Sequence, residues 1–195
     1  MRLSSALHPP SGTAVLLILA FVSPSAAQRI PYAAPVELGR LENQEIRESS
    51  GLAISRRREN VFFTHNDSGG RPRIFAFDLA GKNLGTWTVP DARALDWEDM
   101  ASLEVGGKSY LLLADVGDNG ARRPHCSLYL IEEPRVGDQT ARLVQTVHFR
   151  YADGPHDCEA VAVDPISGDI ILICKTFGFS CKVFLLGWPR QSTKT

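Results

Sequence analysis

Short apolar segments rich in β-branched and aromatic residues recur along the chain, and this recurrence constrains the fold more than any other feature. Gly, Pro, Asn and Asp separate the segments, as is typical of strands joined by turns. Beyond residue 27, no stretch has the 3.6-residue periodicity of an amphipathic helix. The segments form three sets, and the expected strands are 52–54, 61–64, 74–77 and 84–89, then 100–104, 109–114, 127–131 and 143–149, then 161–163, 170–174 and 183–186.

A glutamate stands before the first expected strand of each set. Glu48 and Glu98 are 50 residues apart, and Glu98 and Glu159 are 61 residues apart. A four-stranded unit that repeats at roughly this interval is the signature of a β-propeller blade. We therefore predict an all-β fold, an incomplete β-propeller of two and a half to three blades spanning about 48–90, 96–151 and 157–195. The alternative is an all-β sandwich whose strands resemble one another by accident.

The number of predicted blades is too small for a closed ring, which needs at least four. An open propeller would leave unpaired strand edges, which proteins normally cover or avoid. Two explanations are open. Copies could associate through their open blade edges to close a ring, or the chain could be truncated. The abrupt end of the strand pattern after residue 186 favours truncation.

The N-terminal segment is typical of a secretory signal. Arg2 supplies a positive charge, residues 13–22 form a ten-residue apolar core, and small residues at 25–27 fit a cleavage site before Gln28. The alternative of a membrane anchor fails because ten apolar residues are too few to span a bilayer. We predict a signal peptide over 1–27, a mature domain over 28–195, and a secreted or periplasmic protein without a membrane partner.

Charge and cysteine content narrow the class of protein further. The formal net charge is −1 with no basic block, so nucleic-acid binding is not expected. Export permits disulfides, and the four cysteines (Cys126, Cys158, Cys174 and Cys181) allow three pairings. A hairpin would bring Cys174 and Cys181 together. The alternative of four buried thiols is equally open.

Acidic residues are expected to converge at one end of the predicted blades. The first two strands of a blade are antiparallel, so the start of one lies beside the end of the next. Clustered carboxylates repel unless they are protonated or bound to a cation, and oxygen ligands suit Ca²⁺. The alternative is that these acids only cap turns. The predicted metal ligands are Asp96, Glu98, Asp115, Asp118, Asp157 and Glu159, and the predicted ligand-binding residues are Glu48, Asp67, Asn119, Arg122 and Arg123.

The two arginines are predicted to bind an anionic ligand beside such a cation. Their alternative role is in solvated ion pairs of the loop. Trp97, which stands between two of the acids, is expected to be a packing residue between blades. No G-x-S-x-G nucleophile motif is present in the sequence, so no catalytic residue is assigned.

The chain contains five motifs of small, acidic and amide residues, Ser50-Gly51-Leu52-Ala53, His65-Asn66-Asp67-Ser68, Asp96-Trp97-Glu98-Asp99, Asp115-Val116-Gly117-Asp118-Asn119 and Asp157-Cys158-Glu159-Ala160. Together these motifs resemble a family of secreted bacterial β-propeller proteins of unassigned function. More distantly, the chain resembles six-bladed phytase-like propellers, in which channel carboxylates hold calcium ions that bind substrate phosphates. Only Asp96 with Glu98, and Asp157 with Glu159, match the D-x-E pattern of that second group. About half of a six-bladed ring is missing.

Three functional hypotheses follow from the sequence. The first is an exported module that binds a small-molecule or protein ligand. The second, implied by the phytase-like resemblance, is a calcium-dependent phosphoester hydrolase. The third is a truncated propeller without function.

Overall fold

A computed structural model describes residues 32–188 of the chain. Within that range, the residues from Glu37 onward form one compact unit. The predicted signal peptide, residues 1–27, lies outside the described residues. None of the described residues forms a helix that is long and apolar enough to cross a membrane.

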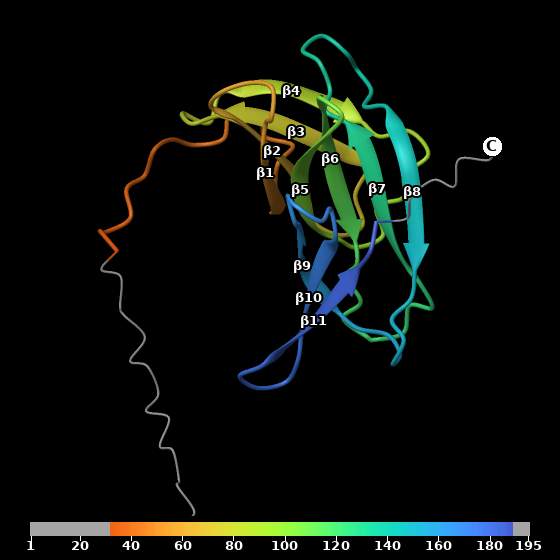
Figure 1. Ribbon diagram of the computed structural model, residues 1–195. Coiled ribbons are helices and arrows are strands. Elements are labelled where there is room, and N and C mark those ends of the chain that lie inside the picture. The colour runs from red at the N-terminus through yellow and green to blue at the C-terminus, as the bar shows by residue number, and fades with distance from the viewer. Residues whose placement is uncertain (1–31, 189–195) are drawn as a thin grey trace, which may run out of the picture. The chain divides into compact units, whose positions relative to one another are not determined.

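Eleven strands form three antiparallel sheets, and no described residue is helical (Figure 1). Within each sheet the strands pair in sequence order. The all-β class and all eleven predicted strands are therefore confirmed. The first sheet contains β1 (Ser49–Ile54), β2 (Val61–Asn66), β3 (Arg73–Asp78) and β4 (Asn83–Thr88); the second contains β5 (Trp97–Val105), β6 (Lys108–Asp115), β7 (Cys126–Glu132) and β8 (Leu143–Phe149); the third contains β9 (Cys158–Val163), β10 (Ile170–Lys175) and β11 (Cys181–Leu186).

The first strands of the three sheets are neighbours, with β5 between β1 and β9. Two side-chain hydrogen bonds tie them together. Ser50 Oγ donates to the carbonyl oxygen of Glu98 at 2.7 Å, and the N–H of Val161 donates to Asp99 Oδ2 at 2.8 Å. The acids that precede or begin these strands are consequently brought to one end of the molecule.

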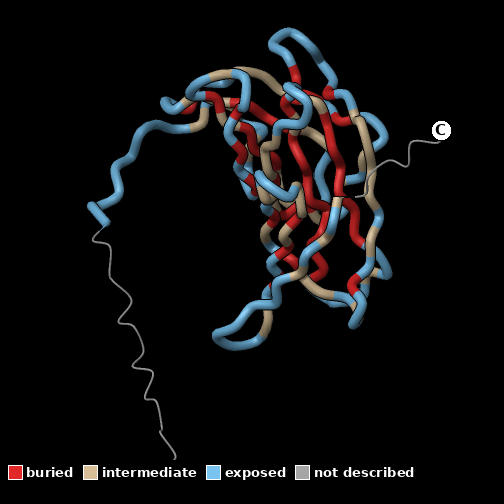
Figure 2. The backbone as a smooth tube through the Cα atoms, viewed as in Figure 1, coloured by how far each residue is buried: buried red, intermediate tan, exposed pale blue. Residues whose placement is uncertain are grey.

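Two hydrophobic clusters fill the spaces between consecutive sheets. Successive side chains of β6 belong alternately to one cluster and to the other. Leu111 and Leu113 belong to the cluster that includes Phe63 of the first sheet, whereas Leu112 belongs to the cluster that includes Leu172 of the third. All five side chains are at most 1% exposed, and each contributes about 1.5–3 kcal/mol of burial free energy. Figure 2 shows that buried residues concentrate in the strands and exposed residues in the loops.

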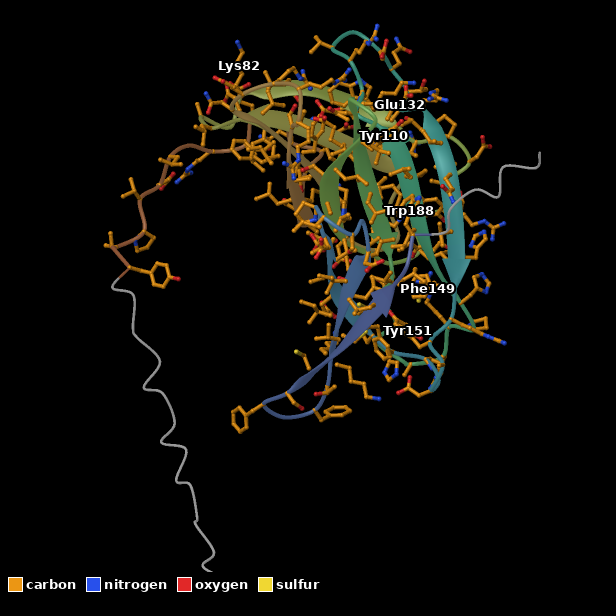
Figure 3. All side chains as sticks on the ribbon, in the orientation of Figure 1. Lys82, Tyr110, Glu132, Phe149, Tyr151 and Trp188 are labelled. Carbon is orange, nitrogen blue, oxygen red and sulfur yellow. The ribbon has the colours of Figure 1, made fainter. Side chains whose placement is uncertain are left out.

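Aromatic side chains close the space between the second and third sheets. The ring of Tyr151 lies 5.3 Å from that of Phe149 and 4.7 Å from that of Phe184, measured between centroids. Phe149 and Trp188 pack against the same cluster, and Phe149 lies beside Tyr151 in Figure 3. The third sheet is therefore packed onto the second through side chains and not through a continuous ladder of hydrogen bonds.

Trp97 is a packing residue, in agreement with the sequence-based expectation. It is 1% exposed, and its ring lies 5.4 Å from that of His65 in β2 and 6.2 Å from that of Tyr129 in β7. Its Nε1 donates to the carbonyl oxygen of Arg93 at 2.8 Å, so the indole N–H is not left without a partner.

The cysteines are free thiols, and the suggested Cys174–Cys181 disulfide is not formed. The hairpin of β10 and β11 does form, but Cys174 pairs with Lys182 and Cys181 pairs with Lys175. Adjacent register positions lie on opposite sides of the sheet, so Cys174 is buried and Cys181 is exposed. The alternative of buried thiols holds for three of the four, since Cys126 and Cys158 are buried as well.

Candidate metal centre

A β-bulge at the start of β5 releases Glu98 from the ladder. Trp97 pairs with Asp115 and Asp99 pairs with Ala114, so no residue stands opposite Glu98. An extra residue of this kind bends the strand and re-aims its own side chain. The pairing of β9 with β10 is irregular in the same way, because Glu159 is passed over. Two glutamates thus leave their strands at equivalent points.

In the first sheet the equivalent position is occupied by Ser50, because β1 is irregular between Ser49 and Leu52. Glu48 lies before the strand and is exposed, and its carbonyl oxygen accepts a hydrogen bond from the N–H of Asp67 at 2.9 Å. The acid that the first sheet contributes to the centre is therefore Asp67, which follows β2.

Five carboxylates converge into two triads that share Glu98. Within each triad, one oxygen from each residue lies within 4.8 Å of one oxygen from the other two, a spacing that could hold a metal ion. The first triad, Asp67, Asp96 and Glu98, joins the first two sheets, and the second triad, Glu98, Asp157 and Glu159, joins the last two. These triads contain four of the six predicted metal ligands, together with Asp67.

Burial and the close approach of these carboxylates raise the pKa of Glu98 in particular. The residue is 9% exposed, and burial raises the pKa of its carboxyl to about 8, with further upward contributions from Glu159, Asp67, Asp96 and Asp157. Burial also raises the pKa of Asp96, and the nearby charge of Asp67 adds to that rise. Without a cation, Glu98 therefore retains its proton at neutral pH.

Lys175 neutralises part of the negative charge of the second triad, whereas the first triad has no such ion pair within the described part of the chain. Its Nζ lies 2.6 Å from Asp157 Oδ2 and 2.5 Å from Glu159 Oε1, and these two carboxylates raise the pKa of the ammonium. Among the described residues, no arginine or lysine forms an ion pair with a member of the first triad. The first triad is thus the better candidate for an external cation.

The other two predicted metal ligands lie outside both triads and have partners of their own. Asp115 Oδ1 accepts hydrogen bonds from the N–H of Asp96 at 3.0 Å and from Arg123 Nη1 at 2.9 Å, while its Oδ2 is buried without a partner. Asp118 Oδ2 accepts the N–H of Arg123 at 2.7 Å. The N–H of Asp118 in turn donates to Asp157 Oδ1 at 2.7 Å. These acids order the loop after β6 around the cluster.

The predicted ligand-binding residues are placed differently from one another. Asn119 Oδ1 accepts a hydrogen bond from Lys175 Nζ at 3.3 Å, so it borders the second triad. Arg123 lies inside the loop, where it also donates to the carbonyl oxygen of Gly117 at 2.7 Å. Arg122 is exposed on the surface of that loop and forms no ion pair with either triad among the described residues. The structure therefore brings Arg123, and not Arg122, next to the acids.

A hollow of about 340 Å³ is lined by Asp115 and by basic groups, of which only Arg123 is among the predicted ligand-binding residues. Arg93, Arg123, His125 and His148 line it, and the Nδ1 of His148 lies 3.0 Å from Ser127 Oγ. These residues come from the loop before β5, the loop after β6, and β8. No local sequence signal could have indicated that they meet, because the second sheet and its connecting loops bring them together.

Gly117 allows the carboxylates to approach the backbone. A Cβ at this position would lie 2.2 Å from Glu98 Oε1 and 2.5 Å from Asp96 Oδ2, closer than any side chain tolerates. Its N–H donates to the carbonyl oxygen of Asp96 at 3.2 Å. A larger residue would therefore displace the two carboxylates, and positive φ is not a reason for glycine here.

Comparison with known proteins adds no relative, since no protein-family model matches the chain and no curated protein is similar to it.

Proposed function

We propose that the chain is an exported module of the β-propeller type that binds Ca²⁺ at the triad of Asp67, Asp96 and Glu98 and, through the cation, a ligand. Three consecutive antiparallel sheets with neighbouring first strands support the propeller interpretation. The uncompensated triad is the observation that carries the function. Ca²⁺ takes six to eight oxygen ligands, so three carboxylates leave coordination positions for water and for an incoming ligand.

The ligand class best suited to this surface is a small molecule with an anionic group. A bound cation would attract the anion, while Arg93 and Arg123 line the hollow that Asp115 also lines. The same juxtaposition favours a second candidate function, a calcium-dependent phosphoester hydrolase. In both cases the cation holds the ligand, and Arg123 fixes the loop that borders it.

Calorimetric titration of residues 28–195 with Ca²⁺ tests the proposal. Wild-type protein should bind, and Glu98→Gln should weaken binding at least about tenfold because it removes the carboxylate common to both triads. Lys175→Met should strengthen binding about tenfold, since it removes the internal cation of the second triad. Glu104→Gln is the matched control, an isosteric change at an exposed position of the same strand.

Absence of Ca²⁺ binding by folded wild-type protein would refute the cation site and, with it, the calcium-dependent hydrolase. Equal affinities of wild type and Glu98→Gln would move the site away from the triads. The hydrolase is tested separately with phosphoester substrates in Ca²⁺ and in chelator. Turnover that survives chelation or the Glu98→Gln change would contradict the hydrolase mechanism.

Gly117→Ala is expected to weaken Ca²⁺ binding at least about tenfold, because the new methyl group forces Glu98 Oε1 and Asp96 Oδ2 apart. Gly120→Ala in the same loop is the control, since its Cβ would meet only Arg122 at ordinary distances of 3.5 Å or more. The measurement is the same titration, and circular dichroism checks that both variants fold. Similar affinities for the two alanine variants would show that close packing at Gly117 is not needed for the site.

A further inference from the structure

Cys158 and Cys174 lie directly opposite each other in the third sheet. Cys158 begins β9 and is the register partner of Cys174 in the antiparallel strand β10. The N–H of Lys175 donates to the carbonyl oxygen of Asp157 at 3.0 Å, whereas the N–H of Cys158 donates outside this sheet, to the carbonyl oxygen of Val116 at 3.3 Å. The two cysteines therefore form a non-hydrogen-bonded pair, the kind in which opposite side chains approach most closely.

The geometry of such a pair suits a disulfide. Non-hydrogen-bonded partners have Cα atoms about 4.5 Å apart, and disulfides join Cα atoms that are about 4.4–6.8 Å apart. Register partners also point to the same face of a sheet. Both thiols are fully buried in the cluster between the second and third sheets. Joining the two sulfurs therefore needs no change in the register of the strands.

The other two cysteines do not share this geometry. Cys126 belongs to the same buried cluster, but it lies in the second sheet, where its register partner is Phe149. Packed sheets are about 10 Å apart, farther than a disulfide reaches. Cys181 is exposed and pairs with Lys175, so it lies on the opposite face of the hairpin from Cys174.

We propose that Cys158 and Cys174 are a site of oxidative modification, at which a disulfide joins β9 to β10. The structure shows the reduced form of this pair. The oxidant is a second disulfide, that of an oxidoreductase or of oxidised glutathione. The thiolate of one cysteine attacks it and releases one thiol, and the other cysteine then resolves the mixed disulfide and releases the second. The protein loses two hydrogen atoms, which the oxidant takes up as two thiols.

This inference takes from the proposed function only the export of the chain, because an oxidising compartment supplies the oxidant. It does not rest on cation binding. The disulfide would nevertheless lie beside the second triad. Cys158 stands between Asp157 and Glu159 in the sequence, and Cys174 precedes Lys175, whose Nζ forms ion pairs with both carboxylates. The crosslink thus joins the strand ends that contribute these three charged groups.

Burial determines when the bond forms. Cys158 Sγ donates to the carbonyl oxygen of Ala160 at 3.8 Å, and Cys174 Sγ donates to Tyr151 Oη at 3.6 Å, so neither thiol contacts water. Burial raises the pKa of Cys158 to about 12, and the folded, reduced protein therefore contains little of the attacking thiolate. The oxidant reaches the thiols while the chain folds, and burial then shields the finished bond from reductants.

Refolding of residues 28–195 with oxidised and reduced glutathione, in the presence of chelator, tests the inference. Thiols that remain free are alkylated in denaturant before digestion with trypsin. Trypsin cleaves after Arg150 and Lys175, and the peptide between these sites contains Cys158 and Cys174 but neither of the other cysteines. This peptide should resist alkylation and should be lighter than its reduced form by two hydrogen atoms.

Thermal unfolding gives a second measurement. The bond closes a loop of about 15 residues, so wild type refolded in oxidant should melt about 6–12 °C above wild type refolded in reductant. Cys158→Ala should abolish this shift and leave Cys174 open to alkylation. Cys126→Ala is the matched control, because it removes a buried thiol of the same cluster and should keep both the bond and the shift.

A peptide that is alkylated at both cysteines after refolding in oxidant would overturn the inference. A crosslink from either cysteine to Cys126 or Cys181 would do the same. The wild-type digest decides the question even where Cys158→Ala does not fold. Oxidation of a protein that binds no Ca²⁺ would refute the proposed cation site alone, and Ca²⁺ binding by a protein that does not form the bond would refute this inference alone.

Discussion

Glu133→Ala is expected to lower the free energy of unfolding by about 3 kcal/mol, although Glu133 lies outside the metal centre. The side chain is fully buried after β7, where it accepts hydrogen bonds from Ser55 Oγ at 2.6 Å and from the N–H of Arg56 at 3.0 Å. Its Oε1 also lies 3.5 Å from Arg57 Nε and 4.0 Å from Arg58 Nε. Removing this carboxylate would leave the turn after β1 without its anion. Because the side chains of both arginines are partly exposed, at 36% and 28%, we expect the lower end of the range for broken buried pairs.

Thermal unfolding of residues 28–195 measures this effect. For a chain of this size, about 3 kcal/mol corresponds to a fall of about 6–12 °C in the melting temperature. Glu132→Ala is a matched control at the adjacent position, since the pair of Glu132 with Arg142 is exposed and should contribute no more than about 1 kcal/mol. Equal falls in the melting temperature of the two variants would mean that burial of Glu133 does not increase its contribution to the free energy of unfolding.

The strands could be predicted from the sequence because their signal is local. Each strand contains its own run of β-branched or aromatic residues, and a turn residue marks its end. The sequence pattern marks the start of the first strand of each sheet less clearly. The pattern predicts a strand from residue 100, whereas β5 begins at Trp97 and includes Glu98 and Asp99. Charged residues in a bulge resemble a loop in sequence, so a strand that begins on them is predicted too short.

The candidate metal centre could be predicted only in part, for a related reason. The repeated D-x-E pattern indicates that Asp96, Glu98, Asp157 and Glu159 could meet, and the structure places all four in the triads. Sequence does not show which acids accept hydrogen bonds from backbone or arginine donors, and for that reason Asp115 is predicted alongside them. The donors to Asp115 are the N–H of Asp96 and the guanidinium of Arg123, which lie 19 and 8 positions away in the chain.

The sequence spacing of the glutamates is also less informative than the register of the strands about which residues occupy equivalent positions in the three sheets. Glu48 precedes Glu98 by 50 residues, but the bulge of β1 lies two residues further on, at Ser50. Ser50 donates to the backbone of Glu98 instead of adding a carboxylate beside it. A glutamate at position 50 would bring a further negative charge toward a carboxyl that already retains its proton at neutral pH.

The stability of the cation-free protein should fall as the pH rises from 7 to 8.5, and Glu98→Gln should remove most of that fall. The pKa of Glu98 is raised from 4.5 to about 8, so around neutral pH the folded protein holds a proton that the unfolded chain has released. This contribution to stability is present in full below pH 4.5 and is lost as the pH rises through about 8. The upward shift in the pKa of Asp96 has the same sign.

Other titrating groups do not obscure this window. Burial lowers the pKa of His65, which penalises the folded state only as the pH falls below about 6.5. Lys182 and His156 lower the pKa of Asp153 to about 2, far below the window. Burial raises the pKa of Cys126 to about 11, but this thiol is present in both proteins. The difference between wild type and Glu98→Gln at each pH therefore isolates the glutamate.

Thermal unfolding in chelator, measured at intervals from pH 5 to pH 8.5, gives that difference directly. Wild type should lose several degrees of melting temperature relative to Glu98→Gln, at about 2–4 °C for each kcal/mol. Excess Ca²⁺ should abolish the loss in wild type alone, because a cation that binds the ionised carboxylate takes the place of the proton. Parallel curves for the two proteins would show that Glu98 ionises at its ordinary pH. The carboxylates would then be too far apart, or too well hydrated, to require a cation.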